Sequence, residues 1–157
     1  MPPGEVITAG ELGGDFILPR NPLLPLAFIA GGIGITPFRS MIKYLLDTGQ
    51  KRDIVLLYSS SSEQEIVFGD VLQDAACRIG LKVVHTLTDP AKLRPGWSGR
   101  TGHIDAGMIS REVPDCRSRH FMVSGSPGMV NAVKAALRAA GVPRRRVRTD
   151  YFPGYSL

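Results

Sequence analysis

A glycine-rich segment near the start of the chain has the residue types and spacing that could bind a phosphate. Residues 30–37 read AGGIGITP, after an apolar run of strand length and before a helical pattern. Glycines let a backbone approach a pyrophosphate closely, and the start of a helix offers free N–H groups and the positive end of its dipole. The segment therefore predicts a phosphate-binding turn, and a plain tight turn is the alternative.

Two features distinguish this turn from the usual dehydrogenase fingerprint. Pro37 occupies the place of the third glycine, and no acid stands about 20 residues further on, where one would bind a ribose hydroxyl. That place reads YSSS at residues 58–61, and Glu63 is the nearest acid. No proton-relay group is evident either, so the sequence disfavours a conventional dehydrogenase that works without a flavin.

The turn lies within a regular alternation of strand and helix patterns. We expect strands at residues 26–30, 53–58, 82–87, 120–124 and 147–152, and helices at 38–46, 68–79, 105–109 and 127–140. Such alternation implies right-handed crossovers and a sheet covered on both faces. The sequence thus predicts an α/β fold with a doubly wound, mainly parallel, five-stranded sheet, which binds ligands beyond the carboxyl ends of its strands.

The first 22 residues differ in character from the rest. Residues 4–10 and 15–18 predict two short strands, and three prolines between 19 and 25 predict a stiff linker. Because two strands are not stable alone, we expect residues 1–22 to belong to a sheet whose other strands lie elsewhere. Residues 23–157 then form the second domain.

Composition excludes several classes of function. The net charge is +5, and the basic residues are spread out except for one cluster at 144–148. This cluster predicts either a solvated turn or a patch for an acidic partner or phosphate. No nucleic-acid recognition motif accompanies it, so we expect no nucleic-acid function.

The two cysteines and the hydropathy pattern bear on location. Cys77 and Cys116 have no metal-ligand spacing, and no signal peptide precedes them, so we predict a cytoplasmic protein without a metal site. The most apolar stretch, residues 23–35, is too short for a membrane span and is broken by glycines and a proline.

Three further motifs follow the glycine-rich turn. Residues 97–104 (WSGRTGHI) come after the third expected strand, and residues 123–129 (VSGSPGM) and 150–155 (DYFPGY) begin at the ends of the fourth and fifth. With the GxGxxP turn, they resemble the W-x-G-x-x-G-x-I, C-G-x-P-x-M and E-x-F-x-G-Y motifs of the NAD(P)-binding domain of the ferredoxin–NADP reductase family. The opening strands resemble the last strands of that family's flavin-binding barrel. The resemblance covers nearly the whole chain and implies the strand order 3-2-1-4-5.

The resemblance implies a flavin-dependent reductase that uses NAD(P)H. The chain would place the nicotinamide for hydride transfer to FAD, and electrons would pass on to an iron–sulfur or haem acceptor protein. FAD would be held mainly by a flavin-binding domain, in cis or in trans, because its Arg-x-Tyr-Ser segment and phosphate loop have no match here. We therefore expect the chain alone to be inactive. The alternative is a dinucleotide-binding regulatory or interaction module without turnover.

The resemblance also implies roles for single residues. Gly32 and Gly34 would face the pyrophosphate, so Gly34→Val is expected to weaken binding more than folding. The implied catalytic residues are Thr36, Ser124, Asp150 and Phe152. The implied cofactor-binding residues are Gly32, Gly34, Ile35, Thr36, Pro37, Ser59, Ser60, Ser61, Gly125, Ser126, Pro127, Met129 and Phe152. For Met129, helical spacing with Val133 makes a core role the alternative.

Three positions depart from the family pattern. Ser124 stands where the family usually has a cysteine against the nicotinamide, and Asp150 replaces a glutamate. Ser61 stands where many members have an arginine that pairs with the 2′-phosphate of NADP. Because a bidentate, charge-assisted pair is then missing, the sequence favours NADH over NADPH.

Overall fold

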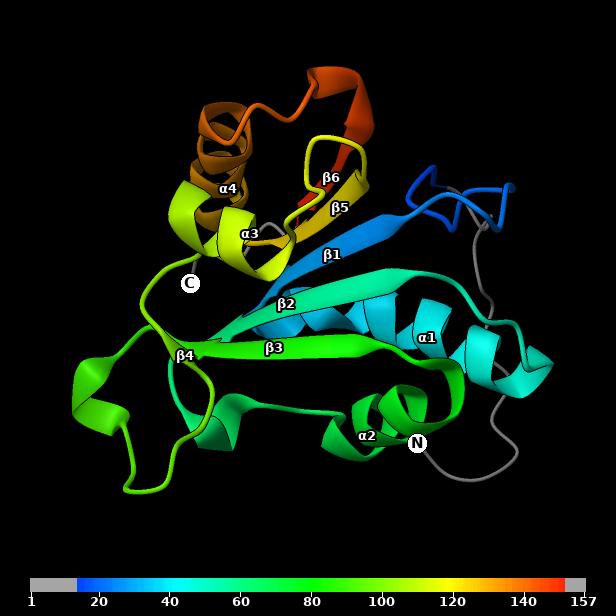
Figure 1. The fold of residues 1–157 in the computed structure, drawn as a ribbon. Coiled ribbons are helices and arrows are strands. Elements are labelled where there is room, and N and C mark those ends of the chain that lie inside the picture. The colour runs from blue at the N-terminus through cyan, green and yellow to red at the C-terminus, as the bar shows by residue number, and fades with distance from the viewer. Residues whose placement is uncertain (1–13, 152–157) are drawn as a thin grey trace, which may run out of the picture.

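A six-stranded parallel sheet forms the middle of the molecule (Figure 1). The structure is a computed structural model and describes residues 14–151. The strands are β1 (Leu26–Gly31), β2 (Ile54–Ser60), β3 (Lys82–Leu87), β4 (Arg100–Thr101), β5 (His120–Gly125) and β6 (Val147–Tyr151). They are arranged β4-β3-β2-β1-β5-β6, and every neighbouring pair is parallel. The prediction of a doubly wound α/β fold is confirmed.

The predicted number of strands was wrong by one. The expected order 3-2-1-4-5 corresponds to β3-β2-β1-β5-β6, and β4 adds a short sixth strand at the edge. Arg100 Nε donates to Glu112 Oε1 at 2.7 Å and so ties β4 to the helix that follows it. Two exposed residues carry no hydrophobic period, which is why the sequence pattern did not reveal this strand.

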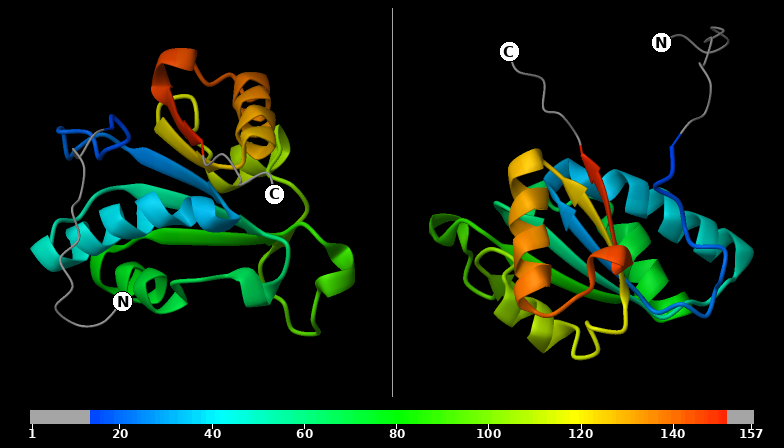
Figure 2. Two further views of the ribbon diagram at one scale, coloured as in Figure 1. Left: turned by 180° about the vertical axis from the view of Figure 1, so that it is seen from behind. Right: turned by 90° about the horizontal axis from the view of Figure 1, so that it is seen from above.

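Four helices cover the two faces of the sheet. They are α1 (Thr36–Thr48), α2 (Gly69–Ile79), α3 (Ala106–Glu112) and α4 (Pro127–Ala139). The short turns are η1 (Gly32–Ile35), η2 (Glu63–Glu65), η3 (Pro90–Lys92) and η4 (Arg144–Arg146). Helices α1 and α2 lie on one face, and α3 and α4 on the other (Figures 1 and 2). None of the helices within residues 14–151 has the length and hydropathy that crossing a bilayer requires.

The central strand β1 packs against both layers because its side chains alternate. Phe28 stacks on Phe38 of α1 with ring centroids 4.6 Å apart. Ile29 faces the opposite way and is buried in the same cluster as Val130 of α4. A strand buried on both faces must be apolar throughout, as the run LAFIA is.

Arg119 connects three strands at the amino end of the sheet. Its guanidinium donates to both carboxylate oxygens of Asp53, at 2.7 and 2.9 Å, and to Asp115 Oδ1 at 2.7 Å. It also donates to Leu26 O at 3.1 Å. These bonds join the starts of β1, β2 and β5, at the end of the sheet opposite to the expected ligand site.

The expected strand at residues 15–18 is wrong. These residues form bends, and Ile17 N donates to Asp15 O at 3.0 Å, as in a tight turn. Phe16 packs edge-on against Phe38 at 5.6 Å, so the segment lies on α1. A strand needs a partner for its backbone groups, and no described strand lies beside it. The other expected strand, at residues 4–10, lies outside the described residues, and the assignment of residues 1–22 to a flavin-binding barrel remains a prediction.

Candidate nucleotide-binding site

The carboxyl ends of β1 and β5 mark the point where the strand order reverses. From β1 the chain builds outward through β2 and β3, whereas β5 and β6 lie on the other side of β1. The connections leave these two neighbouring strands in opposite directions, which opens a crevice where doubly wound proteins bind ligands. Gly31 and Gly125 are the last residues of the two strands.

The two glycines of η1 have different environments. Gly32 has a φ of 52°, and a Cβ placed on it would have no neighbour within 4 Å. Gly34 is buried, and a Cβ there would overlap the carbonyl of Ser124 and lie 2.7 Å from Gly125 N. Gly32 is therefore the open glycine of the turn, whereas Gly34 allows η1 to pack against β5. The expected contact of either glycine with a pyrophosphate remains a prediction.

Met129 lies between the two strand ends. A Cβ on Gly31 would meet its Sδ at 3.0 Å, and a Cβ on Gly125 would meet the same atom at 2.8 Å. The side chain is half-buried and packs on the core between the sheet and α4. Met129 thus has the core role that the sequence offers as the alternative and also lies at the crevice, and its expected contact with a cofactor remains a prediction.

A pocket of about 340 Å³ opens beside Met129, on the α4 side of the sheet. The hydroxyl of Ser126 also accepts a hydrogen bond from Met129 N at 3.4 Å and caps α4. The pocket is lined by Ser59, His103, Ile104, Ser126, Gly128, Met129, Ala132 and Val133. His103, Ile104 and Gly128 had not been expected at the site, because only the folded chain brings the loop after β4 to the start of α4.

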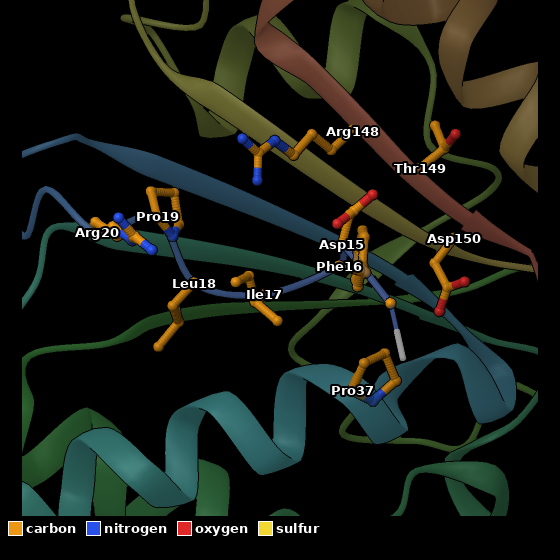
Figure 3. Close-up of a pocket in the computed structure, with 11 residues that line it drawn as sticks. Asp15, Phe16, Ile17, Leu18, Pro19, Arg20, Pro37, Arg148, Thr149 and Asp150 are labelled. Carbon is orange, nitrogen blue, oxygen red and sulfur yellow. The ribbon is translucent and has the colours of Figure 1, made fainter. Parts of the chain in front are cut away.

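A second, wider pocket lies on the α1 side of the same crevice and has a volume of about 960 Å³ (Figure 3). It is bounded by residues 14–20, by Pro37 in the first turn of α1, and by residues 148–150 of β6. Pro37 and the Asp15, Arg148 and Asp150 side chains lie around it, so both charge signs are present. Thr36 is exposed next to Pro37, and its hydroxyl donates to Ile33 O at 2.8 Å.

Ser124 and Asp150 are level on adjacent strands, and Ala30 is the partner of Ser124 on the other side. Partners in a sheet point to the same face, so Ser124 faces the α1 side, where Asp150 lines the wide pocket. Ser124 is 0% exposed, and its hydroxyl has no hydrogen-bond partner among the described residues. A buried hydroxyl without a partner is costly, and here it lies at the switch point of the sheet.

The three serines at the end of β2 have separate surroundings. Ser59 is level with Gly31 of β1 and lines the narrow pocket. Ser60 is buried, and its hydroxyl has no partner among the described residues. Ser61 is held by Glu65, whose Oε1 accepts from the Ser61 hydroxyl and whose Oε2 accepts from Ser61 N at 3.3 Å.

Glu65 was not identified from the sequence. Hydrogen bonds from the Ser61 side chain and backbone lower the pKa of its carboxyl, so it is a carboxylate at neutral pH. The fingerprint places an acid at the strand end itself, and Glu65 comes four residues after Ser61. The turn of η2 brings it back, which no simple spacing rule indicates.

The structure brings most of the expected site residues to one edge of the sheet. The segment after β1 contains Gly32, Gly34, Ile35, Thr36 and Pro37. The end of β5 and the segment after it contain Ser124, Gly125, Ser126, Pro127 and Met129. Asp150 lies on β6, next to β5. Ser59 and Ser60 end the next strand, β2, and Ser61 follows it. Phe152 lies outside the described residues. Within the part of the chain that is described, no three His, Cys, Asp or Glu side chains gather as metal ligands would.

Comparison with known proteins agrees with this geometry. Residues 28–135 match the family described as "Oxidoreductase NAD-binding domain". The chain is 30% identical over 125 residues to the glycine betaine monooxygenase reductase subunit of Pseudomonas aeruginosa, covering 80% of this chain and 34% of that protein. It is 28% identical over 158 residues to ferredoxin–NADP reductase B of Sorangium cellulosum, covering 97% of this chain and 64% of that protein. The chain thus spans less than two thirds of these relatives.

A solved structure has the same fold. The flavohem-like FAD/NAD-binding domain of nitric oxide dioxygenase from Vibrio cholerae superimposes with a TM-score of 0.77 and 21% identity, covering 89% of this chain and 55% of that one. At this identity the likeness shows the fold alone. Taken with the family match over most of the described residues, it leads to one conclusion: this chain belongs to the family of oxidoreductase NAD-binding domains.

Proposed function

We propose that this chain binds NAD(P)H across the carboxyl ends of β1 and β5 and presents the nicotinamide to FAD held by a flavin-binding domain. The observation that carries the proposal is the buried hydroxyl of Ser124 at the switch point, which has no hydrogen-bond partner within residues 14–151. The narrow pocket adjoins this point on one face of the sheet, and the wide pocket on the other. A ligand that crosses the crevice can therefore reach both.

The residues present fit a dinucleotide. Gly32 leaves open space above the turn, and its N–H belongs to the helix start that would face the pyrophosphate. The Ser126 hydroxyl and Met129 would bound the ribose next to it. Bound FAD would supply the acceptor for the hydride. The chain's own residues would hold the nicotinamide in position and exclude water.

The wide pocket supports docking of the flavin-binding domain, whether that domain is covalently linked or separate. It lies on the face to which Ser124 and Asp150 point, next to the exposed Thr36. The expected catalytic roles of Thr36 and Asp150 belong to this contact, and the role of Phe152, which lies outside the described residues, remains a prediction. Onward electron transfer to an iron–sulfur or haem protein, and a cytoplasmic location, are parts of the same proposal.

The alternative is a regulatory module in which the dinucleotide binds without turnover. The two functions differ in what happens beyond binding. An enzyme needs the wide pocket for its flavin partner, whereas a regulatory module needs only the narrow pocket and the turn. Residues 14–20 contact α1 through Phe16 and form one wall of the wide pocket, and the presence of this pocket favours the enzyme.

Calorimetric titration of the purified chain with NADH tests the binding step. We expect binding, a colourless protein, and no oxidation of NADH by the chain alone. Adding a flavin-loaded domain should then permit anaerobic bleaching of the flavin by NADH. If NADH does not bind, the proposal is wrong. If the protein is yellow and keeps its flavin through gel filtration, the flavin is not held mainly by a separate flavin-binding domain.

A further inference from the structure

A third pocket, of about 340 Å³, lies between the second half of α4 and the edge strand β6. Helix and strand lie beside each other there (Figure 1). The pocket shares no lining residue with the narrow pocket. None of its lining residues is acidic, and we call it the cationic pocket because of its side chains: the cations Lys134, Arg138 and Arg144 and the apolar Leu137, Val142 and Val147.

The positive charge of the chain is concentrated around this pocket in the sequence. Residues 117–151 contain eight Lys and Arg residues and one acid, Asp150, whereas the rest of the chain contains 11 Lys and Arg residues and 13 acids. Asp150 lines the wide pocket and points to the α1 side of the sheet. No carboxylate from residues 117–151 therefore neutralises the cationic pocket.

The fold separates the basic cluster of residues 144–148. Arg144 lines the cationic pocket, whereas Arg148 lines the wide pocket on the other face of the sheet. Arg146 turns back to the protein and donates to Arg117 O at 3.1 Å. The sequence leaves open a solvated turn, a patch for an acidic partner and a phosphate site. Because the cluster is divided among three surroundings, the structure favours a compact anion in the pocket over a broad acidic surface.

The cations of the pocket have donor groups available for a ligand. Within residues 14–151, neither Arg138 nor Arg144 has an ion-pair partner, and both are exposed. Lys134 Nζ donates to Tyr151 Oη at 3.4 Å, which uses one of the three N–H groups of the ammonium. Lys134 and Arg138 are four residues apart on α4, so their like charges lie side by side and repel each other. An anion between them would remove this repulsion.

A phosphate monoester has the charge and the geometry for this set of donors. It carries about −1.5 to −2 charges at neutral pH and three acceptor oxygens, whereas a carboxylate carries one charge and two oxygens. The planar guanidinium groups of Arg138 and Arg144 can each donate two N–H groups to phosphate oxygens. Leu137, Val142 and Val147 give the pocket an apolar part that an organic group on the phosphate can contact.

We infer that the cationic pocket is a second ligand site, which binds the phosphate group of a small organic phosphate through Lys134, Arg138 and Arg144. It lies beyond β5, whereas the adenosine half of a dinucleotide would extend from the crevice toward β2. The inference goes beyond the proposed function and does not depend on it.

Calorimetric titration of the full chain with phenyl phosphate tests the site, with NADH present in excess to occupy the turn after β1. We expect one saturable site. Inorganic phosphate should bind there several-fold more weakly, because it lacks a group for the apolar lining. Arg138→Gln and Arg144→Gln should each weaken phenyl phosphate binding by roughly tenfold, the scale for one charge-assisted hydrogen bond. Both side chains are exposed, so circular dichroism should show both variants folded.

Arg145→Gln is the matched control. It removes the same charge from the same turn, η4, and Arg145 is exposed but does not line the cationic pocket. Its affinity for phenyl phosphate should change less than twofold. Amide NMR spectra locate the ligand independently: the signals of Arg138 and Thr149, which line the pocket, should shift, and that of Gly32 should not.

Four results would contradict the inference. Phenyl phosphate gives no saturable binding, or Arg145→Gln weakens it as much as Arg144→Gln does. The NMR shifts appear at Gly32 alone, so the phosphate binds at the turn after β1. A poly-glutamate peptide binds through Arg144 and phenyl phosphate does not, so the surface takes an acidic protein. Failure of NADH to bind would overturn the proposed function only, because the phenyl phosphate titration and its variants still test the cationic pocket.

Discussion

Gly34 lies directly against the backbone of Ser124, so closely that a Cβ on the glycine would overlap the serine carbonyl. The neighbouring Gly125 N would be 2.7 Å from the same Cβ. Neither obstacle is the end of a flexible side chain, so only movement of η1 or β5 could relieve the overlap. The contact joins the turn after β1 to the end of β5 and thereby shapes the crevice.

Gly34→Ala should therefore destabilise the protein by about 2 kcal/mol or more, the range for overpacking a close-packed site. Urea unfolding monitored by circular dichroism measures this. Gly69→Ala, at the start of α2 with no atom within 4 Å of the new Cβ, is the control and should be neutral or slightly stabilising. The sequence predicts that Gly34→Val weakens binding more than folding. The structure reverses this expectation, because the valine side chain would overlap the backbone of Ser124 and impair folding. Equal stability of the two alanine variants would contradict this account.

Gly125→Ala should have a different effect, although it lies next to the same contact. A Cβ there would meet Met129 Sδ at 2.8 Å, and this sulfur lies near the end of a flexible side chain that can move. The displaced Met129 would enter the crevice, so NADH affinity should fall by roughly fivefold, or about 1 kcal/mol. Met129→Ala in the same background should restore part of the affinity. The stability loss should stay smaller than for Gly34→Ala.

Arg119→Met should lower the free energy of unfolding by about 2 kcal/mol, the scale for losing charge-assisted hydrogen bonds, because the acidic partners left behind are exposed to solvent. The side chain is only 10% exposed and holds the starts of three strands. Lys43→Gln, which breaks an exposed pair within α1, should change stability by about 0.5 kcal/mol or less. Thermal and urea unfolding of both variants provide the comparison. Similar losses of stability would show that the network around Arg119 contributes no more than an exposed ion pair.

Glu112 makes the attachment of β4 sensitive to pH. The hydrogen bond from Arg100 lowers the pKa of this buried carboxyl in the folded chain, with added attraction from Arg100 and Lys82. A depressed carboxyl pKa stabilises the folded state above the ordinary value of 4.5, and this stability is lost as pH falls through the depressed folded-state pKa. The stability difference between the native chain and Glu112→Gln should thus be constant near neutrality and vanish in acid. If the difference in stability between the native chain and Glu112→Gln did not change with pH, the carboxylate of Glu112 would not be the group that stabilises the folded state.

The sequence by itself determined most of the elements and the edge of the sheet at which the expected site residues lie. The apolar period distinguished β1, β2, β3, β5 and β6 from the four helices, because each pattern depends on residues within one element. Capping residues also act locally, as Ser126 and Pro127 do at the start of α4. Parallel strands have their carboxyl ends at one edge, so the motifs after them had to converge there.

Only the tertiary structure decided how the loops meet at that edge. Three contacts depend on strand order and register. They are the packing of Gly34 on Ser124, the position of Met129 between Gly31 and Gly125, and the hydrogen bonds between Glu65 and Ser61. The two-residue strand β4 and the bends at residues 15–18 have the same origin, since both are fixed by neighbours distant in sequence. Contacts between distant segments depend on exact distances across the fold, and a pattern of residue types along the chain carries no such distances.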